Sequence, residues 1–208
     1  FHEFGHLLHH VFGGHNRWAG QSGVATEWDF VEAPSQLLEE WAWDPAVLAG
    51  FARHHETGRP IPAEPVRRMK AADEYGKGLR VRRQMSLAAL SLDLHRRDAA
   101  AIDPGRVAAE MQERYTPFRP VEGTYFHLAF GHLEGYSAIY YTYMWSEVIA
   151  KDLFGEFRKA GIMDPATALR YRQRVLEPGG SRRAAELVRA FLGRDHTPDA
   201  FRAWLDAG

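Results

Sequence analysis

The sequence contains no cysteine. This absence excludes a disulfide-linked scaffold, a thiolate nucleophile and any zinc or iron–sulfur site held by cysteine. No run of about 18 consecutive apolar residues occurs, so the sequence predicts no membrane-spanning helix and no membrane partner. The charges nearly cancel, with 26 lysines and arginines against 27 aspartates and glutamates. This balance argues against a nucleic-acid partner held by phosphate attraction.

Strand patterns are also scarce, because no run of alternating β-branched residues is bounded by turns. Helix starts recur instead. Four pairs place a capping side chain directly before a proline: Asp44-Pro45, Asp103-Pro104, Asp164-Pro165 and Thr197-Pro198. Longer helical segments are predicted over residues 65–97, with a break near Gly76, and over residues 136–160. The sequence therefore predicts an all-α fold with few or no strands, organised as one helical domain over residues 1–208.

The chain opens at Phe1, inside an expected helix, with no capping residue before it and no signal-peptide pattern. We therefore expect a fragment whose natural N-terminal part is missing. The absent signal predicts a cytoplasmic location. We also expect self-association through the apolar surface that the missing part would leave uncovered.

Histidines are concentrated at the start of the chain. His2, Glu3 and His6 form an HExxH pattern, which on a helix places two imidazoles one turn apart on the same face. Two such imidazoles can take two corners of a zinc tetrahedron, and the glutamate between them can reach a metal-bound water. The pattern predicts a site for one zinc ion. His9 and His10 complete no known ligand triad, so we expect them to pack in the core or beside the site.

A catalytic zinc site needs a third protein ligand. The metzincin pattern would require glycine and histidine where this chain has His9 and Phe12, so that pattern fails. A glutamate from a second helix is the other solution, and the spacing favours Glu32. Asp29 and Glu39 are alternative acceptors for the ring N–H groups of the histidine ligands.

A second informative segment spans residues 130–148. Tyr136, Tyr140 and Tyr143 follow i, i+4, i+7 spacing, so we expect them to share one helix face near His132. A buried tyrosine hydroxyl needs a hydrogen-bond partner. The stripe therefore either packs as an amphipathic face or presents donors toward a substrate carbonyl, and the residues alone leave both interpretations open.

Taken together, the sequence resembles the thimet oligopeptidase, neurolysin and oligopeptidase A family of zinc metallopeptidases. The matching segments are FHEFGHLLHH at 1–10, DFVEAPSQLLEEWAW at 29–43, FGHLEGYSAIYYTYMWSEV at 130–148 and LEPGGSRRAAELVRAFLGRD at 176–195. The resemblance runs from the first residue to the last in the same order. It implies the helical C-terminal part of a catalytic region. Because the substrate-holding sheet of the family precedes the zinc motif, we expect the isolated chain to be poorly active.

The resemblance implies that His2, His6 and Glu32 bind zinc and that Glu3 is the general base. The implied activity is zinc-dependent hydrolysis of peptide bonds in short peptides, by a metalloendopeptidase or a dipeptidyl carboxypeptidase. Glu3 would assist the attack of the zinc-bound water.

In the aromatic segment, the resemblance implies catalytic roles for His132 and Tyr143 and substrate-binding roles for Tyr136 and Tyr140. The alternative function is a catalytically inactive helical peptide-binding module with a structural metal. Glu3 favours the enzyme, because a structural zinc site has no use for a base between its histidines.

Overall fold

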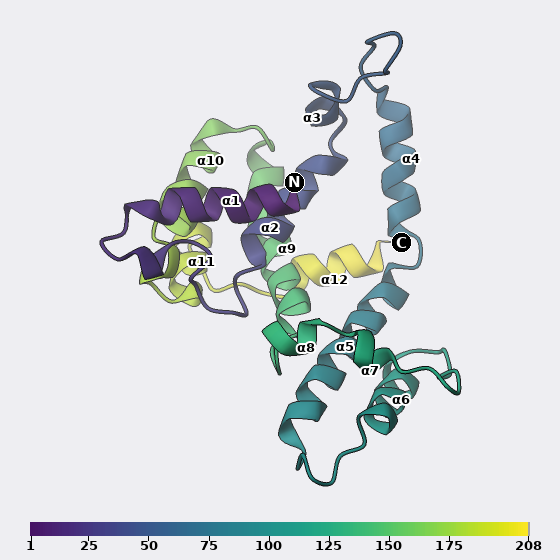
Figure 1. The fold of residues 1–208 in the computed structure, drawn as a ribbon. Helices are drawn as coiled ribbons and strands as arrows, with labels where there is room; N and C mark the ends of the chain where they lie inside the picture. The colour runs from purple at the N-terminus through teal and green to yellow at the C-terminus, as the bar shows by residue number, and fades with distance from the viewer. Residues whose placement is uncertain (208) are drawn as a thin grey trace. The chain divides into compact units, whose positions relative to one another are not determined.

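The computed structural model describes residues 1–207. Across these residues it contains twelve α-helices, joined by short helical turns and loops, and no β-strand (Figure 1). One isolated bridge pairs Arg53 with Pro60. The predicted all-α fold is confirmed. No helix in this part of the chain has both the length and the apolar character needed to cross a membrane.

The chain divides into two compact units. Unit 1 comprises residues 1–75 and 146–208, and unit 2 comprises residues 76–145. The single domain predicted from the sequence stays a prediction. The helices of unit 1 are α1 (His2–Phe12), α2 (Ala33–Glu39), α3 (Pro45–Ala49), α4 (Ala63–Glu74), most of α9 (Thr142–Ala160), α10 (Pro165–Tyr171), α11 (Ala184–Leu192) and α12 (Asp199–Asp206), with the shorter turns η1 (Gly13–His15), η2 (Ala19–Gln21), η3 (Glu40–Trp43), η4 (Arg172–Leu176) and η5 (Gly179–Ser181).

The core of unit 1 lies among α2, α9, η4 and α11. Phe30, Leu37, Leu153, Val175 and Leu187 are each at most 1% exposed there. Helix α1 crosses this core on its α2 side (Figure 1). The two helices of the predicted metal site are therefore anchored by burial of apolar side chains, which is the main stabilising term in folding.

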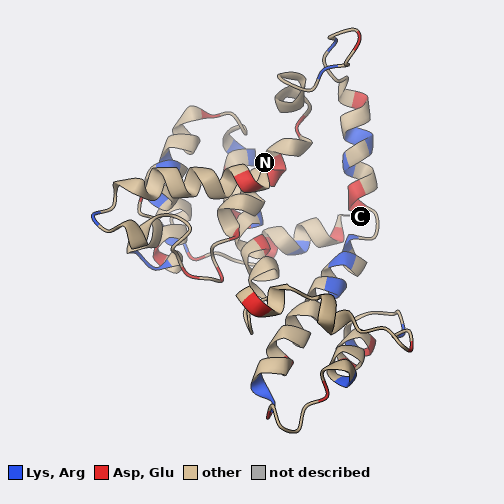
Figure 2. Cartoon of the chain, in the orientation of Figure 1, with Lys and Arg blue, Asp and Glu red and all other residues tan. Residues whose placement is uncertain are grey.

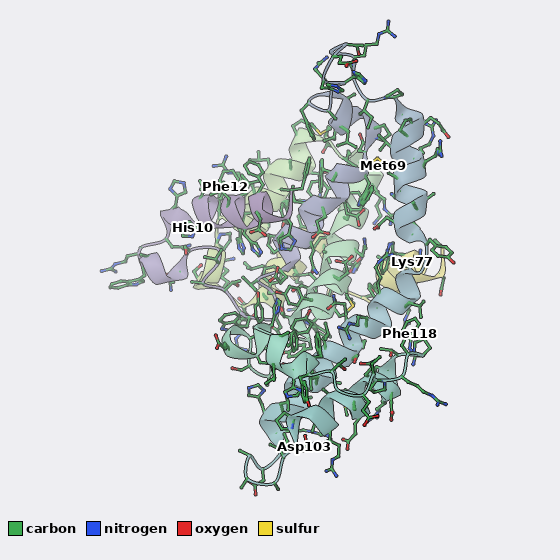
Figure 3. All side chains as sticks on the ribbon, turned by 45° about the vertical axis from the view of Figure 1, so that its right-hand side comes forward. His10, Phe12, Met69, Lys77, Asp103 and Phe118 are labelled. Atoms are coloured by element: carbon green, nitrogen blue, oxygen red, sulfur yellow. The ribbon has the colours of Figure 1, made fainter. Side chains whose placement is uncertain are left out.

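Three of the four predicted helix starts are confirmed, because the aspartate before each proline accepts a backbone N–H. Asp44 caps α3, Asp103 caps α6, where Figure 3 labels it, and Asp164 caps α10. The fourth differs by one residue. Helix α12 begins at Asp199, and Thr197 Oγ1 accepts the Asp199 N–H at 3.5 Å.

Unit 2 contains α5 (Lys77–Arg96), α6 (Pro104–Tyr115), α7 (Phe126–Ala129) and α8 (His132–Gly135). Helices α5 and α6 pack together through Leu87, Leu90, Val107 and Met111. The predicted break near Gly76 is confirmed: this residue has a φ of 70°, between α4 and α5.

The predicted helix over residues 136–160 is wrong at its start. Helix α9 begins at Thr142, six residues later than the tyrosine spacing indicates. Ser137 has a φ of 44°, which lies in the left-handed region and ends regular helical hydrogen bonding. Short turns replace the expected first helical turns, and the N–H of Thr142 bonds to Ile139 O at 2.9 Å.

Candidate metal centre

Helix α1 presents His2 and His6 on the face that lies against α2. Gly5 makes this close packing possible, because a Cβ at this position would lie 2.5 Å from the Cα of Ser35. Glu32 is the N-cap residue of α2, directly before the first helical turn that carries Pro34. The glycine inside the HExxH pattern therefore brings the two histidines to the start of α2, where Glu32 lies.

The three predicted ligands converge. The Nε2 atoms of His2 and His6 lie 3.3 Å and 3.2 Å from Oε2 of Glu32. The ligand atoms of all three residues lie within 4.8 Å of one another. Zinc–ligand bonds of about 2.0–2.1 Å in a tetrahedron place neighbouring ligand atoms about 3.3 Å apart. The donor types and the spacing therefore both fit a zinc ion.

Glu32 is held rigidly at this position. Its side chain is 4% exposed, and the hydroxyl of Ser35 donates to its Oε2 atom at 3.2 Å. The same hydroxyl reaches the backbone carbonyl of Glu32 at 2.9 Å. Ser35 was not identified from the sequence. The sequence signal for Ser35 is its position one helical turn after Glu32. From there a short hydroxyl side chain can donate a hydrogen bond to Glu32.

His2 has a second carboxylate partner. Its Nδ1 atom lies 2.6 Å from Oε1 of Glu39, at the end of α2. Glu39, one of the two alternative acceptors, thus contacts His2. The backbone carbonyl of Asp29 accepts the hydroxyl of Ser146. Hydrogen bonds to Glu32 and then Glu39 raise the pKa of His2 to about 10. A metal ion would compete with this proton for the ring.

Glu3 lies between the two histidines in sequence and is solvent-exposed, so water can reach its carboxylate. Acidic residues gather at this end of α1 (Figure 2). The arrangement combines a cation-binding donor set with an accessible carboxylate one residue away.

His9 lies one turn beyond His6 and is fully buried. Its ring packs edge-on against Phe30, with centroids 6.3 Å apart, and neither ring nitrogen has a hydrogen-bond partner within residues 1–207. Burial, with smaller contributions from His6 and His10, lowers the pKa of His9 to about 4. The core role that the sequence allowed for His9 agrees with this burial, whereas His10 is exposed.

A partly buried ion cluster adjoins Glu39 in sequence. Lys151 of α9 donates to Glu40, lies 3.1 Å from Glu147, and has its ammonium over the Trp204 ring at 4.7 Å. Burial raises the pKa of Glu147 against the attraction of Lys151, and Glu39 and Glu40 raise it further. This cluster was not identified from the sequence, although Glu147 and Lys151 have the i, i+4 spacing of a helical ion pair.

In unit 2, four side chains form what we call the aromatic cluster: His132, Tyr136, Tyr140 and Tyr143. The ring centroids of the three tyrosines lie 5.6, 5.2 and 6.0 Å from that of His132, in sequence order. The prediction that they share one helix face is wrong, because Tyr136 and Tyr140 precede α9. The rings nevertheless gather around His132. Burial is the main cause that raises the pKa of Tyr140.

Comparisons with known proteins agree over nearly the whole chain. The model of peptidase family M3 matches residues 1–206. Oligopeptidase A of Salmonella typhimurium is 37% identical over 210 residues, and that of Escherichia coli is 37% identical over 209. Each of these matches covers 96% of this chain and 30% of the relative. Dipeptidyl carboxypeptidase of Escherichia coli is 34% identical over 201 residues, which cover 93% of this chain and 29% of the relative. The chain therefore spans about 30% of the length of these relatives.

Proposed function

The chain belongs to peptidase family M3, and on that basis we propose that it carries the zinc centre of an enzyme that hydrolyses peptide bonds in short peptides. One observation carries the proposal. The Nε2 atoms of His2 and His6 lie 3.3 Å and 3.2 Å from Oε2 of Glu32, separations that fit a tetrahedral zinc ion, and Glu3 follows His2 in the sequence.

When bound, a zinc ion would supply Lewis acidity, which lowers the pKa of a coordinated water to about 7. Glu3 accepts the proton of the attacking water and delivers it to the departing amine. Ser35 holds the Glu32 carboxylate in place, and Glu39 orients the ring of His2. Each residue thus fixes one ligand or moves one proton.

The family resemblance supports a second set of roles, for the aromatic cluster. We assign the Tyr143 hydroxyl and the His132 ring as hydrogen-bond donors to the oxyanion that forms on the scissile carbonyl. Tyr136 and Tyr140 contact the peptide substrate. Donors aimed at developing negative charge commonly supply the largest single contribution to such a reaction.

The donor count favours catalysis over a structural metal. A structural zinc site closes its fourth position with another protein ligand, whereas a catalytic site leaves that position open. Within the described residues, the cluster consists of His2, His6 and Glu32 alone. Three donors leave one tetrahedral position for the reacting water.

The test is an assay of the full-length protein on short quenched fluorescent peptides. We expect cleavage that a zinc chelator abolishes and that added zinc restores. Zinc bound at one equivalent without any peptide turnover would support a peptide-binding module instead. Turnover that survives complete removal of the metal would contradict the proposed mechanism.

A further inference from the structure

Ser137 has an unusual backbone conformation for its residue type. Among the described residues it is the one non-glycine residue with a positive φ, at 44°. The Cβ of an L-residue is crowded in this region, so the conformation persists where surrounding contacts hold it. Ser137 lies directly after Tyr136 and three residues before Tyr140. The strained residue therefore lies in the segment that carries the side chains of the aromatic cluster.

A buried side chain from another helix bonds to this turn. The hydroxyl of Ser91 donates to the backbone carbonyl of Ser137. Ser91 is 1% exposed and lies in the C-terminal half of α5, where its neighbours Leu87 and Leu90 belong to the core of unit 2. Because α5 is a 20-residue helix packed against α6, its hydroxyl is a fixed anchor for the Ser137 carbonyl.

The turn decides whether the aromatic rings meet. On an unbroken helix, the Cα atoms of Tyr136 and Tyr143 would lie about 10 Å apart along the axis. In the structure the ring centroids of these two tyrosines are 5.4 Å apart, and those of Tyr140 and Tyr143 are 4.9 Å apart. The segment is interrupted at Ser137, and all three tyrosine rings lie within 6.0 Å of the His132 ring, centroid to centroid.

We propose that Ser91 is a positioning residue, whose hydrogen bond holds the turn at Ser137 and thereby assembles the aromatic cluster. Its effect on catalysis rests on the proposed function, whereas its effect on the turn does not. Ser91 touches no substrate in this proposal. It acts through the backbone that carries Tyr136 and Tyr140.

The test uses the full-length protein with Ser91→Ala and the matched control Ser86→Ala, another buried serine of α5. Amide hydrogen exchange is followed in peptides that cover residues 136–141 and residues 2–12. Loss of one buried hydrogen bond should speed exchange in residues 136–141 by about five- to tenfold, without changing residues 2–12 or the bound zinc. Peptide cleavage should lose kcat/KM mainly through a raised KM, because Ser91 acts through the backbone that carries the substrate-contacting Tyr136 and Tyr140.

A second substitution makes the test specific. Glycine adopts a positive φ without the Cβ penalty, so Ser137→Gly should restore slow exchange and turnover in the Ser91→Ala background. If Ser91→Ala fails to fold, Ser91→Cys supplies the same test, because a thiol of similar size is a weak donor. Unchanged exchange in residues 136–141, or an equal effect of Ser86→Ala, would overturn the proposal. An exchange effect in a protein that never cleaves peptides would support the role of Ser91 and refute the proposed function.

Discussion

The Nδ1 atom of His2 lies 2.6 Å from the Oε1 atom of Glu39, one turn past the buried Ser35 on α2. This contact assigns the Nδ1 proton to the hydrogen bond with Glu39. A metal ion that displaces the second ring proton would find the Nε2 atom on the side of Glu32. Carboxylate partners of this kind orient a metal-binding histidine and raise its basicity.

We predict that Glu39→Ala weakens zinc binding by about 10- to 100-fold, the range measured when such partners are removed. Glu39→Gln should lose less, because the amide oxygen still accepts the Nδ1 proton. Zinc affinity is measured by chelator competition, with the exposed Glu56→Ala as the control variant. Equal affinities for the parent and Glu39→Ala would remove Glu39 from the site.

The two other glutamates of the site should behave differently from each other. Glu32→Ala should lose zinc, because it removes one of three ligands. Glu3→Gln should keep zinc and lose about 10²- to 10⁴-fold in turnover, because only the proton acceptor is lost. Zinc content by atomic absorption and peptide cleavage are measured on the same samples. Tight zinc binding by Glu32→Ala would show that the third ligand is a different residue.

The hydroxyl of Tyr143 should matter for turnover more than for substrate binding. Removing one oxyanion donor costs roughly a hundredfold or more in kcat, so Tyr143→Phe should lower kcat and change KM little. Tyr141→Phe is the matched control, since this neighbouring tyrosine is 43% exposed and lies outside the aromatic cluster. A kcat for Tyr143→Phe within twofold of the parent would contradict the assigned role.

Burial of His9 should make the protein sensitive to mild acid. The pKa of His9 is about 4 in the folded chain against 6.5 when unfolded, so between these values the unfolded state binds the proton first. The contribution of His9 to the free energy of unfolding is complete above pH 6.5. As the pH falls toward 4, the free energy of unfolding decreases by about 3 kcal/mol in total. Urea unfolding at a series of pH values between 4 and 6.5 measures this free energy. His9→Leu should flatten the pH dependence, whereas the exposed control His10→Gln should leave it unchanged.

Gly23 should tolerate no side chain. A Cβ at this position would lie 2.0 Å from the carbonyl oxygen and 2.2 Å from the carbonyl carbon of His9, and both are backbone atoms of α1. We expect Gly23→Ala to lower the free energy of unfolding by about 3 kcal/mol. Gly14→Ala is the control, because its Cβ would meet no atom within 4 Å. Similar unfolding midpoints for the two variants would show that the loop can shift away from α1.

Local features of the fold and site could be read from the sequence because they depend on neighbouring residues. His2 and His6 share a face since four residues make about one turn of a helix. The caps at Asp44, Asp103 and Asp164 need a side chain and an N–H two or three residues apart. The same periodicity failed at the tyrosines, where it predicted a helix that Ser137 interrupts.

Tertiary structure decided what depends on residues far apart in the sequence. The sequence offered Glu39 as a partner for a histidine, but only the close packing of α1 on α2 brings it to the Nδ1 atom of His2. The backbone carbonyl of Ser137 accepts a hydrogen bond from Ser91, which lies 46 residues earlier, so no local sequence pattern predicts this turn. By itself the sequence determined the all-α class and the helix caps at Asp44, Asp103 and Asp164. Packing decided which side chains meet, because that depends on the free energy of burying whole helix faces against each other.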